Sequence, residues 1–265
     1  MKSYFCVSDV HSFFKELMTA LDNAGFEKDN PEHILCVLGD LFDRGDETVQ
    51  CFEFIKELNS QNRLIYIRGN HEDLLNDCVN EICAGIVPSW HHFSNGTVKT
   101  ICQFCGQSER IVYDSTRVVY DSTWRDEICE TMQPILDFID ENCVDYAEIG
   151  DYILTHAWVP TYNYLEDFRD ADKSDWEQAR WLNGMEMWKN PKNRIEGKTV
   201  MVGHWHCSWG WSHIRQERKE WPQKNRKDWQ KSFEPFVDDG IVAIDACCAY
   251  SGKINVVILE VDENE

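Results

Sequence analysis

The stretch Val37-Leu38-Gly39-Asp40-Leu41-Phe42-Asp43-Arg44-Gly45 decides how the chain is expected to fold. Val37 and Leu38 end an apolar run typical of a buried strand, and Gly39 marks the point where that strand ends. Asp40 then stands at the carboxyl end of a strand, where open α/β sheets place their ligands. A buried carboxylate needs a cation beside it, because an unpaired charge in a medium of low dielectric constant is costly. The stretch therefore predicts a cation site at the end of a central strand.

Four other segments share this design, in which an apolar run ends on side chains that can bind a metal. Together the five segments supply seven candidate ligands, namely Asp9, His11, Asp40, Asn70, His156, His204 and His206. Carboxylate, amide and imidazole donors suit Mn, Fe, Zn or Co. Any one of these residues by itself is equally well explained as an ordinary polar residue of the core or surface. Seven ligands exceed the needs of one ion and fit two ions that share a carboxylate, for which Asp40 is the natural bridge.

The composition limits the classes of function that we expect. The chain has 265 residues, 43% of them hydrophobic, which is enough for one large domain, and we expect a single domain over 1–265. The net charge of −21 argues against a general binder of nucleic acids or membrane surfaces. No apolar run is long enough to span a membrane, and the first residues lack the features of a signal peptide. We therefore expect a cytoplasmic protein, whose oligomeric state the sequence does not indicate.

The order of the patterns indicates a sheet covered by helices. Strand patterns at 4–8, 34–38 and 64–67 are each followed by a helical pattern, which is typical of right-handed crossovers. The less regular residues from about 85 to 147 are interpreted as a helical insertion beside the site. The basic residues 212–231 are either a solvated loop or a flap that faces the substrate.

The twelve cysteines are expected to be reduced thiols, several of them acting as small core residues. Cys102 and Cys105 form one Cys-x-x-Cys pair, but a zinc site needs a second pair, and Cys78 and Cys83 are too widely spaced to form one.

The motifs resemble those of a known family. The motifs, in chain order, are Asp9-x-His11, Gly39-Asp40-x-x-Asp43-Arg44-Gly45, Gly69-Asn70-His71-Glu72, His156 and Gly203-His204-x-His206, and they resemble the calcineurin-like metallophosphoesterase superfamily. The longer stretch 66–72 and the tail 244–253 are similar to the bacteriophage-type branch of Ser/Thr phosphoprotein phosphatases. The resemblance implies an α/β fold, in which two mixed β-sheets form a sandwich flanked by helices, with the metal ions at the strand ends.

The resemblance also implies roles for single residues. One ion would take Asp9, His11, Asp40 and His206, and the other Asp40, Asn70, His156 and His204. Manganese is the expected metal, with Fe, Zn, Co or Ni as alternatives, and a hydroxide that bridges the ions would attack phosphorus in line.

Three further residues would serve the reaction. His71 would protonate the leaving oxygen, and Asp43 would hold His71 in its protonated form. Arg44 would grip the phosphate together with Asn70, unless it forms only a salt bridge at its turn.

The chain departs from this branch in two places. A Trp-x-Arg motif, whose arginine binds phosphate in the branch, is replaced by Trp181-Leu182-Asn183, with Arg180 just before it. Either Arg180 turns to the substrate or the second phosphate clamp is absent. The last motif offers His206, as in the wider superfamily, where the branch usually has Gly-His-Thr-Pro.

These patterns leave three functions open. The first is a phosphohydrolase acting on phosphomonoesters, most simply a Ser/Thr protein phosphatase. The second is a hydrolase of dinucleoside polyphosphates such as diadenosine tetraphosphate, or of another phosphodiester. In that case purines would stack on Trp158, Trp205 or Trp209, unless these residues only pack in the core or at the rim. The third is a metal-binding scaffold without turnover, although a scaffold has no need of a leaving-group acid such as His71.

Overall fold

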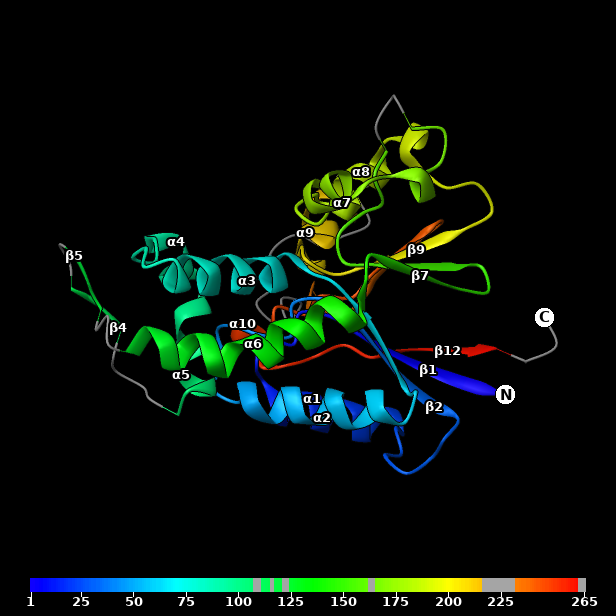
Figure 1. Ribbon diagram of the computed structural model, residues 1–265. Coiled ribbons are helices and arrows are strands. Elements are labelled where there is room, and N and C mark those ends of the chain that lie inside the picture. The colour runs from blue at the N-terminus through cyan, green and yellow to red at the C-terminus, as the bar shows by residue number, and fades with distance from the viewer. Residues whose placement is uncertain (107–110, 115–116, 121–123, 162–164, 216–231, 262–265) are drawn as a thin grey trace.

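Two five-stranded sheets lie at the centre of the computed structural model, which describes residues 1–106, 111–114, 117–120, 124–161, 165–215 and 232–261 (Figure 1). The first sheet has the order β12-β1-β2-β3-β6, with β1 at Lys2–Val7, β2 at His33–Leu38, β3 at Leu64–Ile67, β6 at Cys143–Val144 and β12 at Val257–Val261. All strands but β12 run parallel. The polar residues that follow β1, β2 and β3 therefore meet at one edge of this sheet.

The second sheet also has parallel strands at its centre. Its order is β10-β11-β9-β8-β7, with β7 at Tyr146–Ile149, β8 at Tyr152–Thr155, β9 at Thr199–Val202, β10 at Phe236–Asp238 and β11 at Ile241–Ala243. The three inner strands are parallel, and β7 and β10 are antiparallel edges. Both sheets are mixed, so the predicted class of two mixed sheets flanked by helices is confirmed.

Alternation along β2 shows how the layers are held together. Leu35 and Val37 belong to the core between the first sheet and its helices, whereas Cys36 and Leu38 belong to the core between the two sheets. A strand buried on both faces reads as a continuous apolar run, as this one does. The helices that pack on the first sheet are α1 (Phe14–Ala24), α2 (Thr48–Ser60), α3 (Asn70–Cys83), α5 (Thr97–Phe104) and α6 (Arg125–Asn142).

The second sheet is covered by shorter helices, which lie above β7 and β9 in Figure 1. They are α7 (Lys173–Ala179), α8 (Gly184–Lys189) and α9 (Cys207–Trp209), accompanied by 3₁₀ turns at Phe168–Asp170 and Pro191–Asn193 and a π-helical turn at Gly210–Arg215. Trp158, Trp176 and Trp188 fill the core between these helices and the sheet. A last short helix, α10 (Cys248–Ser251), precedes β12.

Residues 85–147 contain α4 (Trp90–Asn95), α5 and α6, together with a hairpin that the sequence pattern did not indicate. Its strands are β4 (Ile111–Asp114) and β5 (Arg117–Tyr120), at the far end of the molecule from the termini in Figure 1. Of the basic segment 212–231, residues 216–231 lie outside the described part of the chain. Both interpretations of that segment therefore stay predictions.

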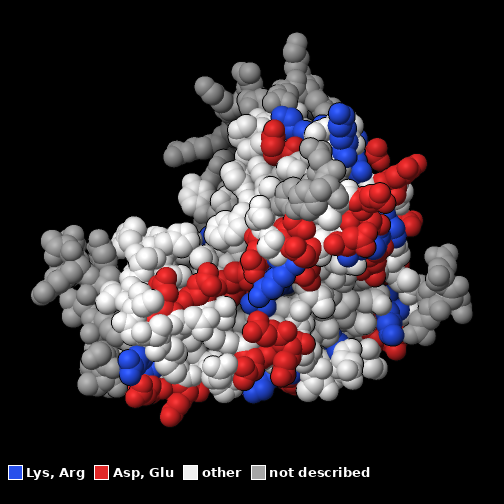
Figure 2. All heavy atoms as spheres, turned by 45° about the horizontal axis from the view of Figure 1, so that its top comes forward, with Lys and Arg blue, Asp and Glu red and all other residues white. Residues whose placement is uncertain are grey.

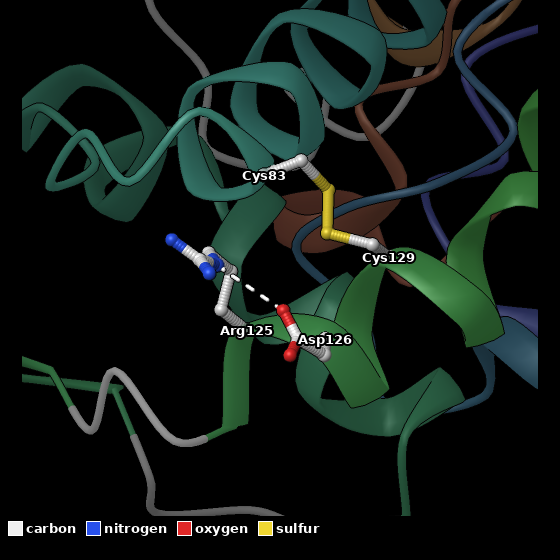
Figure 3. Close-up of a disulfide and its surroundings, with 4 residues drawn as sticks. All are labelled: Cys83, Arg125, Asp126 and Cys129. Atoms are coloured by element: carbon white, nitrogen blue, oxygen red, sulfur yellow. Dashed lines mark hydrogen bonds and ion pairs between the residues drawn. A yellow bond between two sulfur atoms is a disulfide. The ribbon is translucent and has the colours of Figure 1, made fainter.

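One pair of cysteines differs from the expected reduced thiols. Cys83 at the end of α3 and Cys129 in α6 form a disulfide (Figure 3). The pair is 46 residues apart in sequence, and the packing of α3 against α6 brings the two Cα atoms to 5.9 Å. Spacing along the chain gave no sign of this pairing, because only tertiary packing creates it.

None of the helices in the described part of the chain combines the length and apolar character needed to cross a membrane.

Candidate metal centre

The turns after the strands have an uncommon backbone conformation. Nine described residues other than glycine have positive φ, and eight of them lie in the predicted motifs or beside Asp245, namely Asp9, His11, Ser12, Asp40, Asp43, Arg44, His204 and Cys247. Each such conformation costs an L-residue about 1–2 kcal/mol. Conformations of this kind persist where the surrounding structure enforces them, and they cluster at functional sites.

Two glycines of the motifs are required because carboxylates lie against their backbones. A Cβ atom at Gly69 would collide with the Asp40 carboxylate, and one at Gly203 would collide with the Asp9 carboxylate. The close approach lets the backbone N–H of His204 donate to Asp9 Oδ2 at 2.9 Å. The glycines of these motifs therefore serve the placement of the carboxylates.

Asp40 lies between two groups of donor atoms. Its Oδ2 is 3.8 Å from His11 Nε2, and its Oδ1 is 3.4 Å from His156 Nε2. Asp9 joins the first group, with Oδ1 3.9 Å from His11 Nε2. In the second group, donor atoms of Asp40, His156 and His204 lie within 4.8 Å of one another. The structure thus brings together six of the seven predicted ligands in two groups that share Asp40, once Asn70 is included.

Two buried imidazoles are oriented by backbone carbonyl groups. His11 Nδ1 lies 2.8 Å from the Phe42 carbonyl, and His156 Nδ1 lies 2.7 Å from the Leu38 carbonyl. Burial lowers the pKa of His11 and His156, and lowers that of His204 to about 2, so all three rings are neutral. A ring that donates from Nδ1 keeps the lone pair of Nε2 for a metal.

Two contacts in this cluster test whether a cation fits. His11 Nε2 is buried and has no hydrogen-bond partner among the described residues. The lone pair of His156 Nε2 faces Asn70 Oδ1 at 2.9 Å, so two acceptors meet without a proton between them. Buried polar atoms normally have partners. The mixed oxygen and nitrogen donors therefore fit divalent cations of the Mn, Fe, Zn or Co type.

Asp245, directly after β11, is a buried site residue that sequence reasoning missed. Burial raises its pKa to about 7 and that of Asp40 to about 6. Burial, with Asp245 and Asp40 nearby, also raises the pKa of Asp9 well above its ordinary value. Three carboxylates in one buried place require positive charge. The signal was present, since Asp245 follows the apolar run 241–244 as the predicted ligands follow theirs.

His206 is placed differently from the other predicted ligands. Its side chain is 45% exposed, and its Nε2 lies 3.9 Å from Asp245 Oδ2. The structure does not include it in either group of donor atoms. Its predicted role as a ligand of the first ion therefore stays a prediction.

His71 is held by a carboxylate from the central turn. Its Nδ1 lies 2.6 Å from Asp43 Oδ2, and the hydroxyls of Thr97 and Thr100 on α5 donate to the same carboxylate. Burial lowers the pKa of His71, but the carboxylates of Asp40 and Asp43 outweigh it and raise this pKa to about 9. His71 lies close to His11 and Asp40, yet a protonated imidazole has no lone pair for a metal. His71 therefore differs from the neutral imidazoles of His11, His156 and His204.

The two arginines predicted to bind phosphate differ in surroundings. Arg44 is exposed, its Nη2 lies 3.3 Å from His71 Nε2, and no described carboxylate forms an ion pair with it. Arg180 is buried, with Nη1 2.6 Å from Asp73 and Nη2 2.5 Å from Asp145. Two carboxylates already occupy its guanidinium, so the structure does not turn Arg180 toward the donor groups.

Glu72 connects the two turns that carry Asp40 and Asn70. It accepts from the backbone N–H groups of Asp40, Leu41 and Gly69, at 3.0, 2.9 and 2.8 Å, and from the Tyr66 hydroxyl. Glu72 therefore holds the two turns in a fixed position relative to each other. The motif pattern by itself predicts no role for this residue.

The three tryptophans predicted to stack on purines do not share one environment. Trp158 is buried in the core, and Trp209 stacks on His213. Trp205 is 41% exposed and stands between two of the predicted ligands. Trp181, which we had not considered for stacking, is 47% exposed, and its ring centroid is 6.0 Å from that of His204.

Comparisons with known proteins identify the family of the chain. A family model described as calcineurin-like phosphoesterase matches residues 3–238. The bis(5'-nucleosyl)-tetraphosphatase PrpE (asymmetrical) of Anoxybacillus flavithermus is 36% identical over 78 residues, which are 27% of this chain and 32% of that protein. The symmetrical bis(5'-nucleosyl)-tetraphosphatase of Psychromonas ingrahamii is 34% identical over 68 residues, 26% of this chain and 23% of that protein. The chain thus matches about a third or less of the length of these relatives.

Among solved structures, a protein serine/threonine phosphatase from Saccharomyces cerevisiae overlaps with a TM-score of 0.47 and 15% identity. The overlap covers 100% of this chain and 81% of that one.

Proposed function

Because the chain belongs to the calcineurin-like phosphoesterase family, we propose that it is a phosphohydrolase that works with two divalent metal ions. The observation that carries this proposal is the position of Asp40, whose two oxygens face different groups of donor atoms. We propose Asp9, His11 and Asp40 for one ion, with His206 as a further ligand, and Asp40, Asn70, His156 and His204 for the other. Manganese is our first choice of metal.

When bound, such a pair of cations lowers the pKa of water and stabilises the negative charge that develops on a phosphoryl group. The acidic character of the protein makes this contribution necessary. Asp and Glu prevail over Lys and Arg on the face shown in Figure 2, and the net charge is −21. A phosphate would be repelled by this surface unless local cations reversed the field.

The chain's own residues supply the remaining chemistry. We propose that Nε2 of His71 gives its proton to the leaving oxygen while Asp43 holds Nδ1. We also propose that Arg44 and Asn70 bind phosphate oxygens. With His71 protonated, its Nε2 and Arg44 Nη2 are both donors, and they lie 3.3 Å apart at a half-buried position. An anion placed against them would satisfy both.

Phosphomonoesters are the first substrate class we propose, with phosphoserine or phosphothreonine in proteins as examples. The support for it is the exposure of Arg44, which can reach a terminal phosphoryl group on a protein surface as well as one on a small molecule. Assignment to the bacteriophage-type branch and a cytoplasmic location stay predictions from the sequence.

Dinucleoside polyphosphates are the second class, favoured by the relatives, which are bis(5'-nucleosyl)-tetraphosphatases. The short shared segment makes this substrate a proposal for the present chain.

One assay series tests the activity and separates these substrates. The purified protein would be stripped with EDTA, reloaded with Mn, and assayed on p-nitrophenyl phosphate, a phosphoserine peptide, bis-p-nitrophenyl phosphate and diadenosine tetraphosphate. Turnover of the first two supports a phosphomonoesterase, and cleavage of the tetraphosphate alone supports the second class. Binding of two metal equivalents without turnover of any substrate would contradict the proposed activity and favour a scaffold.

A further inference from the structure

Exposed aromatic rings lead from the surface of the protein to the second group of metal donors. Trp90, Trp181 and Trp205 are 57%, 47% and 41% exposed, whereas Trp124, Trp158 and Trp188 are fully buried. The His91 ring on α4 lies 6.5 Å from the ring of Trp181, and the ring of Trp181 lies 6.0 Å from that of His204. The rings come from segments far apart in the chain, so only the fold assembles this surface.

Trp181 is held firmly although its ring is exposed. Its neighbour Arg180 is anchored by Asp73 and Asp145, and the Trp181 N–H donates to the Gln178 carbonyl at 3.2 Å. The indole itself lies between the rings of His91 and His204. The backbone that carries the indole is therefore held in place before any ligand arrives, which lowers the cost of ordering it on binding.

We propose that Trp181, with the His91 ring beside it, is a stacking platform for the nucleobase of a nucleoside polyphosphate whose phosphate chain reaches the metal centre. This proposal rests on the phosphohydrolase function proposed above and names a substrate class for the same site. Stacking of bases on aromatic side chains does not depend on a basic surface, so it is compatible with the net charge of −21.

The position of Trp181 favours a base over a phosphorylated tyrosine. The indole lies beside the imidazole of His204, and His204 in turn lies within the group of donors that includes the shared carboxylate of Asp40. An aromatic group stacked there must be connected to the reacting phosphorus by a spacer. The ribose and phosphates of a nucleotide form such a spacer, whereas the ring of a phosphotyrosine is bonded directly to the ester oxygen.

The test compares Trp181→Ala and Trp181→Phe with wild type on Mn-loaded protein. Substrates are diadenosine tetraphosphate and inorganic triphosphate, which has no base. We expect Trp181→Ala to lower the ratio of the two kcat/KM values about tenfold or more, mainly through KM for the dinucleotide. Trp181→Phe keeps an aromatic face and should recover part of this ratio. Ile258→Ala, 41% exposed on β12, is the control and should leave the ratio unchanged.

A binding measurement complements the kinetics. Calorimetric titration should show that Trp181→Ala weakens the binding of ADP about tenfold more than the binding of pyrophosphate. The proposed stacking platform would be overturned if Trp181→Ala left the kcat/KM ratio unchanged or weakened the binding of both ligands equally. It would also be overturned if the variant lost activity only on a phosphotyrosine peptide. Wild-type protein that hydrolyses p-nitrophenyl phosphate but not the dinucleotide would also overturn it, while the phosphohydrolase function would stand. Wild-type protein that hydrolyses no phosphoester would instead contradict that function.

Discussion

The two sheets contribute to the site in different ways. The first sheet supplies Asp9, His11, Asp40 and Asn70 on turns that hydrogen-bond to one another, with Glu72 connecting two of these turns. The second sheet supplies single residues, and two of them are aligned by the first. His156 bonds to the carbonyl of Leu38 on β2, and the N–H of His204 donates to Asp9. The first sheet therefore forms a connected frame for the site, and the second sheet adds the remaining residues to it.

The largest effect is expected at the centre of the first-sheet frame. Asp40→Asn should lose both metal ions and lower kcat on p-nitrophenyl phosphate by more than the roughly 10²–10³-fold that follows the loss of one electrostatic contact. Metal analysis and steady-state kinetics measure both. Asp46→Asn, whose side chain is 85% exposed, is the control. A folded Asp40→Asn protein with two metals and parental activity would refute the shared carboxylate.

His71→Asn tests a first-sheet residue that lies among the donors without serving as one. We expect both metals to remain and kcat on a phosphoserine peptide to fall about 10²–10³-fold, because a poor leaving group needs a proton. The loss on p-nitrophenyl phosphate should be smaller. The exposed His213→Asn is the control. A loss of metal together with activity would show that His71 is a ligand.

Asp245→Asn tests the second sheet. Asp245 touches His206 and raises the pKa of Asp9, so its charge should favour metal at the first group. We expect Mn to bind about tenfold more weakly, as when outer partners of metal ligands are lost, with kcat at saturating Mn nearly retained. A loss of metal and kcat as large as that expected for Asp40→Asn would contradict the view that the second sheet only completes a site framed by the first.

The smallest effect concerns the pH dependence of stability after EDTA treatment. The raised pKa values of Asp40 and Asp245, about 6 and 7, stabilise the fold at low pH, and this contribution is lost as pH rises through those values. His71, whose pKa is raised to about 9, stabilises the fold fully below about pH 6.5, and this stabilisation is lost as pH rises through 9. The pKa values of His11, His156 and His204 are lowered in the fold, so these residues reduce the stability as pH falls below about 6.5.

The melting temperature of the stripped protein should therefore fall by several degrees between pH 6.5 and 9, at about 2–4 °C per kcal/mol for a chain of this size. Differential scanning calorimetry measures this change. Most of this fall comes from His71, because its pKa lies near 6.5 in the unfolded chain and about 9 in the fold. Mn should reduce the fall, because cations beside His71 disfavour its protonated form, and His71→Asn should flatten the stripped profile over this range. A flat profile in the stripped wild type would contradict the raised pKa of His71.

Much of the site could be predicted because its ligands stand in short motifs directly after apolar runs. Asp245 follows an apolar run in the same way, but no histidine or glycine stands directly beside it to mark a motif. Thr97 and Thr100 could not be found, since their contact with Asp43 depends on how α5 packs over the central turn. Arg180 was assigned to substrate from its place beside Trp181, but the distant Asp73 and Asp145 engage it instead.

The sequence alone determined the residues after the strands and the need for cations, because burial of a carboxylate and the order of apolar runs are properties of the chain itself. The two-sheet class followed from the resemblance of these motifs to a known family. The tertiary structure alone decided which oxygen of Asp40 faces which group, the pairing of Cys83 with Cys129, and the meeting of His91 with Trp181. These contacts join residues dozens of positions apart. Their geometry follows from the packing of helices and sheets, which no local pattern encodes.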